Sequence, residues 1–540
     1  MRSREILLIE PGYPNKYPPL GLMKLAAYHG PAGRGDNVTF VKGENKEMLK
    51  RSWDRVYVTT LFTFEWKRTA SAIDFAIRAA GGQPERVFVG GIAVSLMQEA
   101  FVKEPRWAGV RFVRGLLDRP PPVALELSSS DFEFGADDLA GTPIEELVPD
   151  YGILEDIDYS YPVHDAYFGY ASRGCVRTCS FCGVPKLEGG QREMPPLTNL
   201  VEEVAKRHGE KKDLVLMDNN IAASTRYREV IAEIRDLGFT PGAKLSRDGE
   251  RPTKRRVDFN QGVDARILAK SDMFLREMST ICISPLRIAF DHIGVRKVYE
   301  RSIRMAAQNQ ITSLSNYMLY NFMDTPADLY QRMRLNIDLN EELGIRIWSF
   351  PMRYQPVTLK DRSHVGKGWN RYYLRSFQLM LQATKGVVSG SPPFFRRAYG
   401  QNEEEFESLL RLPHAFIFHR EYFEDGEGRD QKEEYESLRR QLSLPQEAEF
   451  VHLLSNPSNR SGMGSRYFRD LATDKTIDRH LRRLMMFHGL DTSEDAQTNG
   501  RRLMLEMTAS GDYLDEDEVV EDAGLFDHDE AIALKGTQVV

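Results

Sequence analysis

The segment Ser172-Arg173-Gly174-Cys175-Val176-Arg177-Thr178-Cys179-Ser180-Phe181-Cys182-Gly183 carries three of the chain's four cysteines within eight residues. It follows a short apolar run, 168–171, that has the length of a β-strand. Thiols separated by three and then two residues can surround one inorganic centre, and the flanking glycines let the backbone turn closely around the sulfurs. The sequence therefore predicts a metal or cluster site in a loop that follows a strand.

Apolar strands and amphipathic helices alternate from this loop to about residue 355. The predicted strands are 168–171, 214–217, 257–262, 286–290, 314–322 and 345–350. The predicted helices between and after them are 197–207, 227–237, 271–278, 295–308 and 327–343. Six such units indicate a parallel β/α barrel, complete or partial, over residues 167–360. Most of these strands end in polar residues, at the edge where the chemistry of a barrel is placed.

The N-terminal residues show the same alternation on a smaller scale. Strands are predicted at 6–9, 38–41, 56–61 and 87–89, and helices at 22–29, at 70–80 and from about 93. Continuous apolar strands separated by helices are typical of a parallel sheet that is covered on both faces. We therefore expect a Rossmann-like domain over residues 1–125. Residues 126–166 show no sustained periodicity and are interpreted as a connector.

The C-terminal part of the chain is predicted to be mainly helical. Residues 403–412 and 476–488 are the best helical windows, and residues 361–509 are expected to form a helical domain that caps the open end of the barrel. Ten acidic residues and no Lys or Arg lie between residues 512 and 530. This composition predicts a disordered acidic tail over 510–540.

The composition of the 540 residues excludes several classes of protein. Apolar residues make up 41% and charged residues 28%, which rules out a disordered chain and a collagen-like repeat, and four cysteines rule out a disulfide scaffold. A net charge of −7 argues against a globally basic nucleic-acid binder. No apolar run reaches the roughly 18 residues of a membrane span, and no signal-peptide core precedes the first strand. We expect a cytoplasmic protein without membrane contact.

Two kinds of inorganic centre fit the cysteine loop. A zinc site needs a fourth ligand, for which His164 and Cys282 are the candidates, although the spacing is unusual for zinc. An iron–sulfur cluster held by three cysteines leaves one iron without a protein ligand, as a catalytic site requires. In that case Cys282 is a buried residue that behaves like a small apolar side chain.

The cysteine loop resembles a known superfamily. Cys-x3-Cys-x2-Cys with an aromatic residue before the last cysteine, after the first strand of a β/α barrel, resembles the radical S-adenosylmethionine (SAM) superfamily. The stretches around it resemble the cobalamin-binding-domain branch: Ser172-Arg173-Gly174-Cys175, Cys179-Ser180-Phe181-Cys182, Pro18-Pro19-Leu20-Gly21-Leu22 and the pair Gly90-Gly91. The resemblance covers roughly residues 5–355.

The resemblance implies a cofactor set and a reaction. It implies a [4Fe–4S] cluster on Cys175, Cys179 and Cys182, with the amino and carboxylate groups of SAM on the fourth iron. An external one-electron donor such as flavodoxin or ferredoxin would reduce the cluster, which would cleave SAM and start radical chemistry on a substrate that the sequence does not identify. The implied enzyme is a possible methyltransferase, and rearrangement or oxidation without cobalamin is the alternative.

The resemblance also implies ligand-binding residues, which lie in the cysteine loop or follow later predicted strands. Asp218, with Asn219 and Asn220, would contact the SAM ammonium group, and Phe181 would lie near the adenine. Gln261, Asp264 and Arg266 would face the cavity, and Asp291 would lie near the SAM ribose or carboxylate. Asn321 and Asp324 occupy the turn after the fifth strand, although Ala289-Phe290-Asp291-His292 and Asn321-Phe322-Met323-Asp324 depart from the family's strings. The alternative for each polar residue is a helix cap or a turn former.

Cobalamin binding by the N-terminal domain is left open by the sequence. The Asp-x-His-x-x-Gly signature of corrinoid proteins is absent, although the resembled branch often binds cobalamin without it. The candidate lining of a groove at the sheet edge is Thr59, Thr60, Thr63, Gly90 and Gly91; the alternative is a fold retained without a ligand. The methylthiotransferase branch is disfavoured, because its N-terminal domain brings three more cysteines and this one has none.

Two further groups of residues have both a functional and a plain interpretation. The basic residues Lys244, Arg247, Arg251, Lys254, Arg255 and Arg256 could contact nucleic acid or a phosphate-bearing substrate, but a solvated loop is the more common case. His414, His419, Tyr422 and Phe423 lie beside acids and could hold a second metal. A non-catalytic metal-binding scaffold is the alternative to an enzyme for the chain as a whole.

Overall fold

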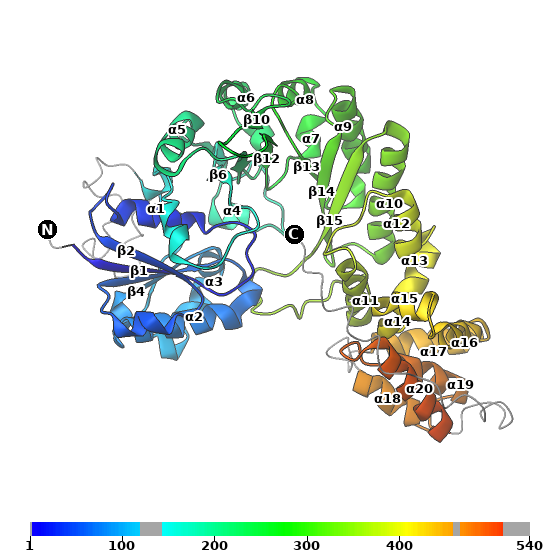
Figure 1. Ribbon diagram of the computed structural model, residues 1–540. Coiled ribbons are helices and arrows are strands. Elements are labelled where there is room, and N and C mark those ends of the chain that lie inside the picture. Colours follow the sequence, from blue (N-terminus) through cyan, green and yellow to red (C-terminus); the bar gives the residue numbers. More distant parts are fainter. Residues whose placement is uncertain (1–2, 119–142, 457–464, 511–540) are drawn as a thin grey trace. The chain divides into compact units, whose positions relative to one another are not determined.

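The computed structural model describes residues 3–118, 143–456 and 465–510 (Figure 1). These residues form two compact units. The first contains the described residues up to Trp369 together with Thr384–Phe406, and the second contains Asn370–Ala383 together with the described residues from Glu407 onward. Residues 119–142, within the predicted connector, and residues 511–540 of the predicted acidic tail lie outside the described ranges.

The first unit begins with a five-stranded parallel sheet of order β2-β1-β3-β4-β5. Its strands are β1 (Glu5–Glu10), β2 (Asn37–Lys42), β3 (Arg55–Thr60), β4 (Val87–Gly91) and β5 (Arg111–Phe112), and its helices are α1 (Leu20–His29), α2 (Trp66–Ala79) and α3 (Ile92–Val102). Side chains alternate along β1, so that Leu7 and Ile9 join the core under α2 and α3 while Leu8 is buried on the opposite face. Figure 1 shows α1 and α2 on opposite sides of the sheet. This confirms the predicted Rossmann-like domain.

The strand order has a consequence for ligand binding. In a doubly wound sheet of order 2-1-3-4-5 the connections from β1 and β3 leave in opposite directions, which opens a crevice at the carboxyl ends of these two strands. The loop after β1 and the loop after β3 meet there, where the Tyr13 hydroxyl accepts a hydrogen bond of 3.0 Å from the Leu61 amide. This edge of the sheet is therefore the place where the fold favours a ligand.

The central part of the first unit is an open β/α barrel of six parallel strands, which we call the half-barrel. They are β6 (Ala166–Gly169), β9 (Asp213–Leu216), β12 (Val257–Phe259), β13 (Leu286–Ala289), β14 (Ser313–Tyr320) and β15 (Arg346–Arg353). Two ladders, β12-β9-β6 and β13-β14-β15, are joined by the parallel bridges Val257–Ile283 and Val263–Ile288. The helices on the outside are α5 (Leu197–His208), α6 (Tyr227–Asp236), α7 (Ala265–Leu268), α8 (Met273–Met278), α9 (Arg296–Gln308) and α10 (Pro326–Leu343). The predicted β/α barrel is confirmed in its partial form, since no pairing of β15 with β6 occurs among the described residues.

Several strand ends differ from the predicted ones by one to three residues, and turn geometry accounts for two of them. β12 stops at Phe259, before the turn in which the Gly262 amide donates to the Phe259 carbonyl and Gly262 adopts φ +88°. β14 stops at Tyr320, because Asn321 adopts the left-handed φ of +67°. The short helix α7, which the apolar pattern does not predict, begins where the Asp264 carboxylate caps the Arg266 amide.

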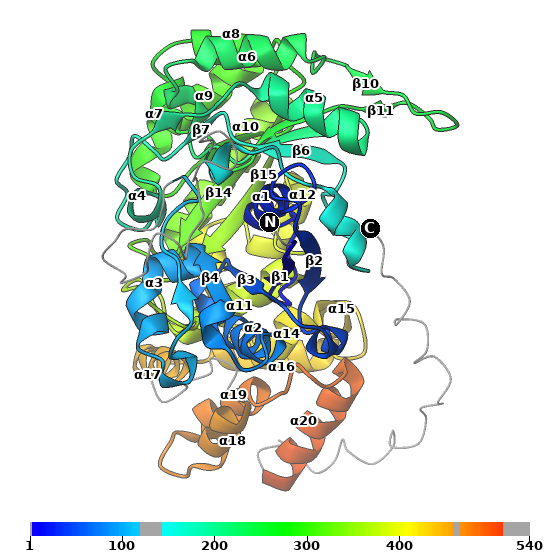
Figure 2. The same ribbon diagram turned by 90° about the vertical axis from the view of Figure 1, so that its left-hand side faces the viewer.

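Two small antiparallel ribbons lie outside the parallel strands of the half-barrel. The ribbon β7 (Ser172–Arg173) with β8 (Arg192–Glu193) brackets the cysteine loop and the short helix α4 (Val184–Leu187). The ribbon β10 (Lys244–Leu245) with β11 (Thr253–Lys254) carries the basic segment and projects from the barrel (Figure 2). Of the six cations of this segment, Arg247 pairs with Asp165 at 2.8 Å and Arg255 pairs with Glu210 at 3.4 Å.

The second unit is helical, as predicted. Its helices are α11 (Arg371–Gln382), α14 (His414–Phe418), α15 (Arg420–Glu424), α16 (Arg429–Arg440), α17 (Leu444–Ser455), α18 (Ser465–Thr473), α19 (Arg479–His488) and α20 (Ala496–Ser510). The boundary between the units falls within α13 (Glu403–Leu410), and α12 (Pro392–Tyr399) belongs to the first unit. Buried aromatic side chains such as Phe416, Phe423 and Phe487 form the core of the second unit. No helix among the described residues is both long and apolar enough to cross a membrane.

Candidate functional site

The cysteine loop follows β6 at the carboxyl edge of the half-barrel and begins at a glycine that cannot be replaced without strain. Gly174 has φ +78°, and a Cβ there would lie 2.2 Å from the Gly190 carbonyl oxygen. This close approach lets the Cys175 amide donate to the Gly189 carbonyl. The loop is closed at its other end by a hydrogen bond of 3.0 Å from the Cys182 amide to the Cys179 carbonyl. The glycine predicted to permit a tight turn is thus required by the geometry.

The three thiols of this loop are free and partly exposed. The Arg177 amide lies 3.4 Å from Cys175 Sγ, and the Val184 amide lies 3.4 Å from Cys182 Sγ. Burial raises the pKa of Cys182, and the Val184 amide partly opposes that shift. Amide donors aimed at sulfur stabilise thiolates and tune the potential of iron–sulfur clusters. Three soft thiols with such donors fit an iron–sulfur cluster, although no three His, Cys, Asp or Glu side chains within the described ranges are close enough to hold a single ion.

Ion pairs that share the Asp264 carboxylate join the cysteine loop to the loop after β12. The Asp264 carboxylate accepts a hydrogen bond of 2.7 Å from Arg177 Nε and one of 2.8 Å from Arg266 Nε. Burial alone would raise the pKa of Asp264, but the hydrogen bonds from Arg266 and Arg177 outweigh it and lower the pKa. Burial also raises the pKa of Cys179, and the neighbouring Arg266 guanidinium counters that rise. The structure therefore brings Arg266 and Asp264 together with Cys179.

Asp291 faces the same thiols from the loop after β13. Burial raises its pKa to about 6, against the attraction of Arg332 and Arg266, and its charge in turn raises the pKa values of Cys179 and Cys182. Its backbone is held by Arg332 of α10, whose guanidinium donates to the Asp291, Phe290 and Leu319 carbonyls. Sequence reasoning missed Arg332; its only signal was a cation within the buried side of a predicted helix.

Asp218 lies at the end of β9, immediately behind the start of the cysteine loop. It is fully buried and accepts hydrogen bonds from the Ala171 amide, the Ser172 amide and the Ser172 hydroxyl. Burial raises its pKa to about 6. Both carboxylate oxygens are thus engaged with the chain, and neither caps a helix. Contact of Asp218 with a SAM ammonium group stays a prediction.

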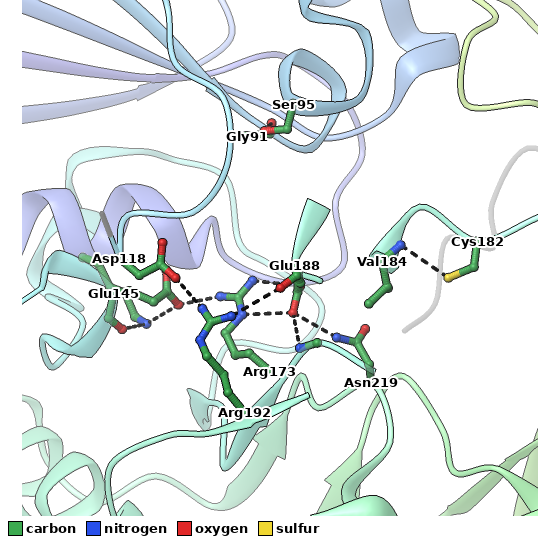
Figure 3. A network of polar contacts seen from close by, with 12 residues as sticks. Gly91, Ser95, Asp118, Glu145, Arg173, Cys182, Val184, Glu188, Arg192 and Asn219 are labelled. Atoms are coloured by element: carbon green, nitrogen blue, oxygen red, sulfur yellow. Dashed lines mark hydrogen bonds and ion pairs between the residues drawn. The ribbon is translucent and has the colours of Figure 1, made fainter. Parts of the chain in front are cut away.

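The two asparagines after Asp218 also bond within the protein. Asn219 Nδ2 donates a hydrogen bond of 3.1 Å to the Glu188 carboxylate (Figure 3). Asn220 Oδ1 accepts a hydrogen bond of 3.3 Å from the Asp264 amide. Gln261 is exposed and donates to the Asn260 side chain. Asn219 thereby links the loop after β9 to Glu188, and Asn220 links the loop after β9 to the loop after β12. Their predicted ligand contacts stay predictions.

The turn after β14 places an aromatic pair beside the loop. Phe181 packs edge-on against Phe322 with ring centroids 5.7 Å apart. Asn321 is fully buried, donates to the Tyr354 and His364 carbonyls, and accepts from the Gly366 amide. Asp324 pairs with Arg332 at 2.9 Å. Asn321 and Asp324 therefore fix loops in this structure.

The two candidate fourth ligands for zinc lie at the wrong edge of the half-barrel. The Cys282 carbonyl accepts a hydrogen bond from the amide of Val257, the first residue of β12. His164 precedes β6, and its ring nitrogen contacts the Tyr161 carbonyl. Both positions are at the amino ends of the strands, whereas the cysteine loop follows a carboxyl end. Because parallel strands place these ends on opposite edges, His164 and Cys282 do not complete the cysteine set.

The carboxyl edge of the Rossmann-like sheet adjoins the cysteine loop. A Cβ on Gly183, the residue after Cys182, would lie 3.2 Å from Leu96 Cδ1 of α3, the helix that follows β4. Of the groove residues predicted there, Thr60 donates to the Gly90 carbonyl and accepts from the Val94 amide. Gly91 adopts φ +100° with its Cα close to the Thr60 backbone. Internal bonds thus occupy these residues.

A cavity of about 600 Å³ lies at the same edge beside β1 and β2, which sequence reasoning did not find. Its lining comes from the loop after β1, the end of β2, α2 and the connector: Gly12, Tyr13, Pro14, Val41, Lys42, Asn45, Arg68, Asp156, Ile157, Asp158 and Tyr159. None of these residues comes from the loop after β3, so the crevice that the strand order predicts at the ends of β1 and β3 is a neighbouring position, and we identify no sequence signal for the cavity itself.

The C-terminal histidines do not gather into a metal site among the described residues. His414 is buried, with its ring stacked on Tyr372 at 4.2 Å between centroids. Burial lowers the pKa of His414 to about 3. The side chain is thus a neutral core residue of the second unit.

The chain thus combines two parts. A parallel Rossmann-like sheet is followed by a six-stranded β/α half-barrel, and the first strand of the half-barrel leads into a Cys-x3-Cys-x2-Cys loop. This order of elements and this cysteine motif agree with the fold that the sequence resemblance to the radical SAM superfamily implies. No family model matches the chain.

Curated relatives match only part of the chain. The ribosomal protein uS12 methylthiotransferase RimO of Anaeromyxobacter sp. (strain K) is 25% identical over 150 residues, 26% of this chain and 32% of the relative. RimO of Chlorobium phaeobacteroides (strain DSM 266 / SMG 266 / 2430) is 33% identical over 86 residues, 14% of this chain and 19% of the relative. The matches thus span a third or less of these relatives, and no cysteine lies in the N-terminal 125 residues of this chain.

Solved structures of low similarity include two cobalamin enzymes. The radical S-adenosylmethionine methyltransferase TsrM from Kitasatospora setae, with cobalamin and a [4Fe-4S] cluster bound, is 16% identical, with a TM-score of 0.43 over 66% of this chain and 74% of that chain. The cobalamin-dependent S-adenosylmethionine radical enzyme OxsB is 12% identical, with a TM-score of 0.44 over 95% of this chain and 82% of that chain.

Proposed function

We propose that this chain is a radical SAM enzyme with a [4Fe–4S] cluster on Cys175, Cys179 and Cys182. The observation that carries the proposal is the single loop with three free thiols at the carboxyl edge of a β/α half-barrel, where two of the sulfurs face backbone amides. When bound, such a cluster with an open iron supplies the electron that cleaves SAM to methionine and a 5′-deoxyadenosyl radical.

The residues around the thiols have distinct roles in this proposal. Arg266 places a positive charge beside Cys179 and favours its thiolate form. Asp291 faces the thiols from the opposite loop and is a candidate acceptor for a polar group of SAM. Phe181 and Phe322 provide an apolar wall that excludes water from one side of the site.

We extend the proposal to cobalamin-dependent methyl transfer. It is supported by the contact of Leu96 with Gly183, which places the carboxyl edge of the Rossmann-like sheet next to Cys182, and by the cavity at that edge. The second candidate is a radical SAM enzyme whose Rossmann-like domain is empty, which the internal bonds of Thr60 favour. Reconstitution with hydroxocobalamin separates the two: retained corrinoid absorbance after desalting supports methyl transfer, and complete loss supports the empty domain.

Iron content tests the cluster assignment. After anaerobic reconstitution with iron and sulfide, the wild-type chain is expected to hold about four irons and four sulfides. Cys179→Ala is expected to lose most of them, whereas Cys282→Ala, the matched control at the other edge of the barrel, retains them. Stoichiometric zinc in a colourless wild-type protein would support a metal-binding scaffold instead. An electron donor such as flavodoxin or ferredoxin, and a cytoplasmic location, belong to the same proposal.

A further inference from the structure

Four charged side chains of alternating sign form a buried row that ends at the cysteine loop, and three of them, Glu145, Arg173 and Glu188, are labelled in Figure 3. Lys24 of α1 lies 3.0 Å from Glu145, Glu145 pairs with Arg173, and Arg173 Nη2 lies 2.8 Å from Glu188. The four side chains are only 6–8% exposed. The charges sum to zero, so the row is neutral as a whole. The row runs from the Rossmann-like domain through the connector to both ends of the loop.

At the loop, the Glu188 carboxylate accepts from a backbone amide just before the three cysteines and from a side chain in the loop after β9. Its Oε2 accepts 2.8 Å from the Gly174 amide, directly before Cys175, and 3.1 Å from Asn219 Nδ2. Glu188 itself follows Cys182 by six residues, at the C-cap of α4. One carboxylate therefore ties the start of the loop to its end and to the loop after β9.

At the other end, Lys24 fastens the row to the N-terminal domain. Its ammonium group donates to both the carbonyl and the carboxylate of Glu145. Burial alone would raise the pKa of Glu145, but Lys24 and Arg173 outweigh it and lower that pKa, in keeping with an ionised carboxylate. Loss of one member leaves a buried charge without its counter-ion, which is far more costly than loss of an exposed pair.

We propose that Glu188 is a positioning residue for the cluster-binding loop and that Lys24, 150 residues upstream of the loop, positions the same loop through Glu145 and Arg173. The row holds Gly174, and with it Cys175, at a fixed place against α1 of the Rossmann-like domain. The proposal rests on the proposed function for the meaning of the loop, but the positioning itself is a property of the cofactor-free chain.

The first test measures hydrogen exchange by mass spectrometry in the cofactor-free full chain. Lys24→Met is expected to speed exchange of the peptide amides over 174–184 at least fivefold. Lys42→Met is the matched control, because Lys42 forms an equally buried pair with Glu10 in the same domain, at 2.7 Å, but has no link to the loop. The control is expected to change exchange over 174–184 less than twofold. Equal effects of the two variants would overturn the proposal.

The second test uses Glu188→Gln, which keeps the size of the side chain and removes its charge. Glu193→Gln is its control, since Glu193 accepts hydrogen bonds from Ser224 and Thr225 rather than from the loop. In cofactor-free protein, Cys175 of Glu188→Gln is expected to be alkylated at least threefold faster than in wild type, with Cys282 as the internal reference. Glu188→Asp is expected to restore most of the protection. An unchanged Cys175 rate in a folded Glu188→Gln protein would refute the role of Glu188.

The reconstituted proteins provide an independent readout. Glu188→Gln is expected to bind iron in wild-type amounts but to give an altered electron paramagnetic resonance spectrum of the reduced cluster, because the geometry around Cys175 changes. Loss of iron in parallel with loss of fold would mean a purely structural role. A wild-type chain that binds no cluster would refute the proposed function alone, since the exchange and alkylation results do not depend on iron.

Discussion

At the scale of a single residue, the backbone conformation of Gly174 determines the geometry of the cysteine loop. Its left-handed φ, and the 2.2 Å that would separate an added Cβ from the Gly190 carbonyl oxygen, exclude any side chain. Gly174→Ala is expected to lower the free energy of unfolding by roughly 2 kcal/mol more than Gly189→Ala and to reduce bound iron to less than half. Gly189 is the matched control, because it has φ +74° and open space around its Cα.

Denaturant unfolding and iron analysis of the two glycine variants check this prediction. Gly189→Ala should show only the cost of a left-handed alanine, about 1–2 kcal/mol, with normal iron content. Equal iron content in both variants would mean that the close approach of Gly174 to Gly190 does not shape the cysteine loop.

Single residues also mark the limit of what the sequence could predict. The spacing of the three cysteines and the need for Gly174 follow from the sequence, because each is a local property. The engagement of Asp218 with Ser172, and of Asn321 with Gly366, could not be predicted, because those partners lie 46 and 45 residues away. A polar residue at a strand end reveals its chemistry only when its long-range partners are known.

At the scale of secondary-structure elements, α10 positions the loops after β13 and β14 through Arg332. Arg332→Met would leave Asp324 buried without its counter-ion and is expected to cost roughly 3–5 kcal/mol. Arg334→Met on the same helix removes an exposed pair with Asp338 and is expected to cost less than about 1 kcal/mol. Unfolding followed by tryptophan fluorescence measures both, since all five tryptophans lie in the first unit. Similar costs for the two variants would contradict the role given to Arg332.

His414 of α14, which stacks on Tyr372 of α11, makes the stability of these helices depend on pH. The pKa of buried His414 is about 3 in the folded chain, below the value of about 6.5 in an unfolded chain. The unfolded state therefore binds the proton first, and stability is lost as pH falls below about 6.5. Between pH 7.5 and 5.0 this loss amounts to about 2 kcal/mol.

Substitution of His414 isolates this contribution. His414→Phe preserves the stacking on Tyr372 and is expected to remove about 2 kcal/mol of the pH dependence of helix opening in the second unit. Hydrogen exchange of α11 and α14, corrected for intrinsic rates, measures the opening free energy. An unchanged pH dependence in the variant would show that His414 is not the titrating group.

The order and type of the elements were largely predictable, whereas their exact ends were not. Apolar runs such as 214–216 and 286–289 became strands as predicted, because burial on both faces leaves a clear hydrophobic signal. The ends of β12 and β14 depend on the backbone at Gly262 and Asn321, and α7 is too short for a periodic pattern. Turn geometry, rather than hydrophobic pattern, decided these positions.

At the scale of the whole molecule, the relation between the Rossmann-like domain and the half-barrel carries the functional argument. The sequence predicted both folds but not the row from Lys24 to Glu188 nor the contact of Leu96 with Gly183, because these join residues that are far apart in the chain. The same contacts place the edge of the N-terminal sheet beside the cysteine loop. A cofactor bound at that edge would therefore lie near the cysteine loop.

The most direct test of the account is the formation of 5′-deoxyadenosine from SAM by anaerobically reconstituted protein after reduction with dithionite. The account predicts product from the wild-type chain and from Cys282→Ala, and at least a hundredfold less from Cys175→Ala, Cys179→Ala and Cys182→Ala. Undiminished 5′-deoxyadenosine from any one of the three loop variants, with full iron content, would contradict it.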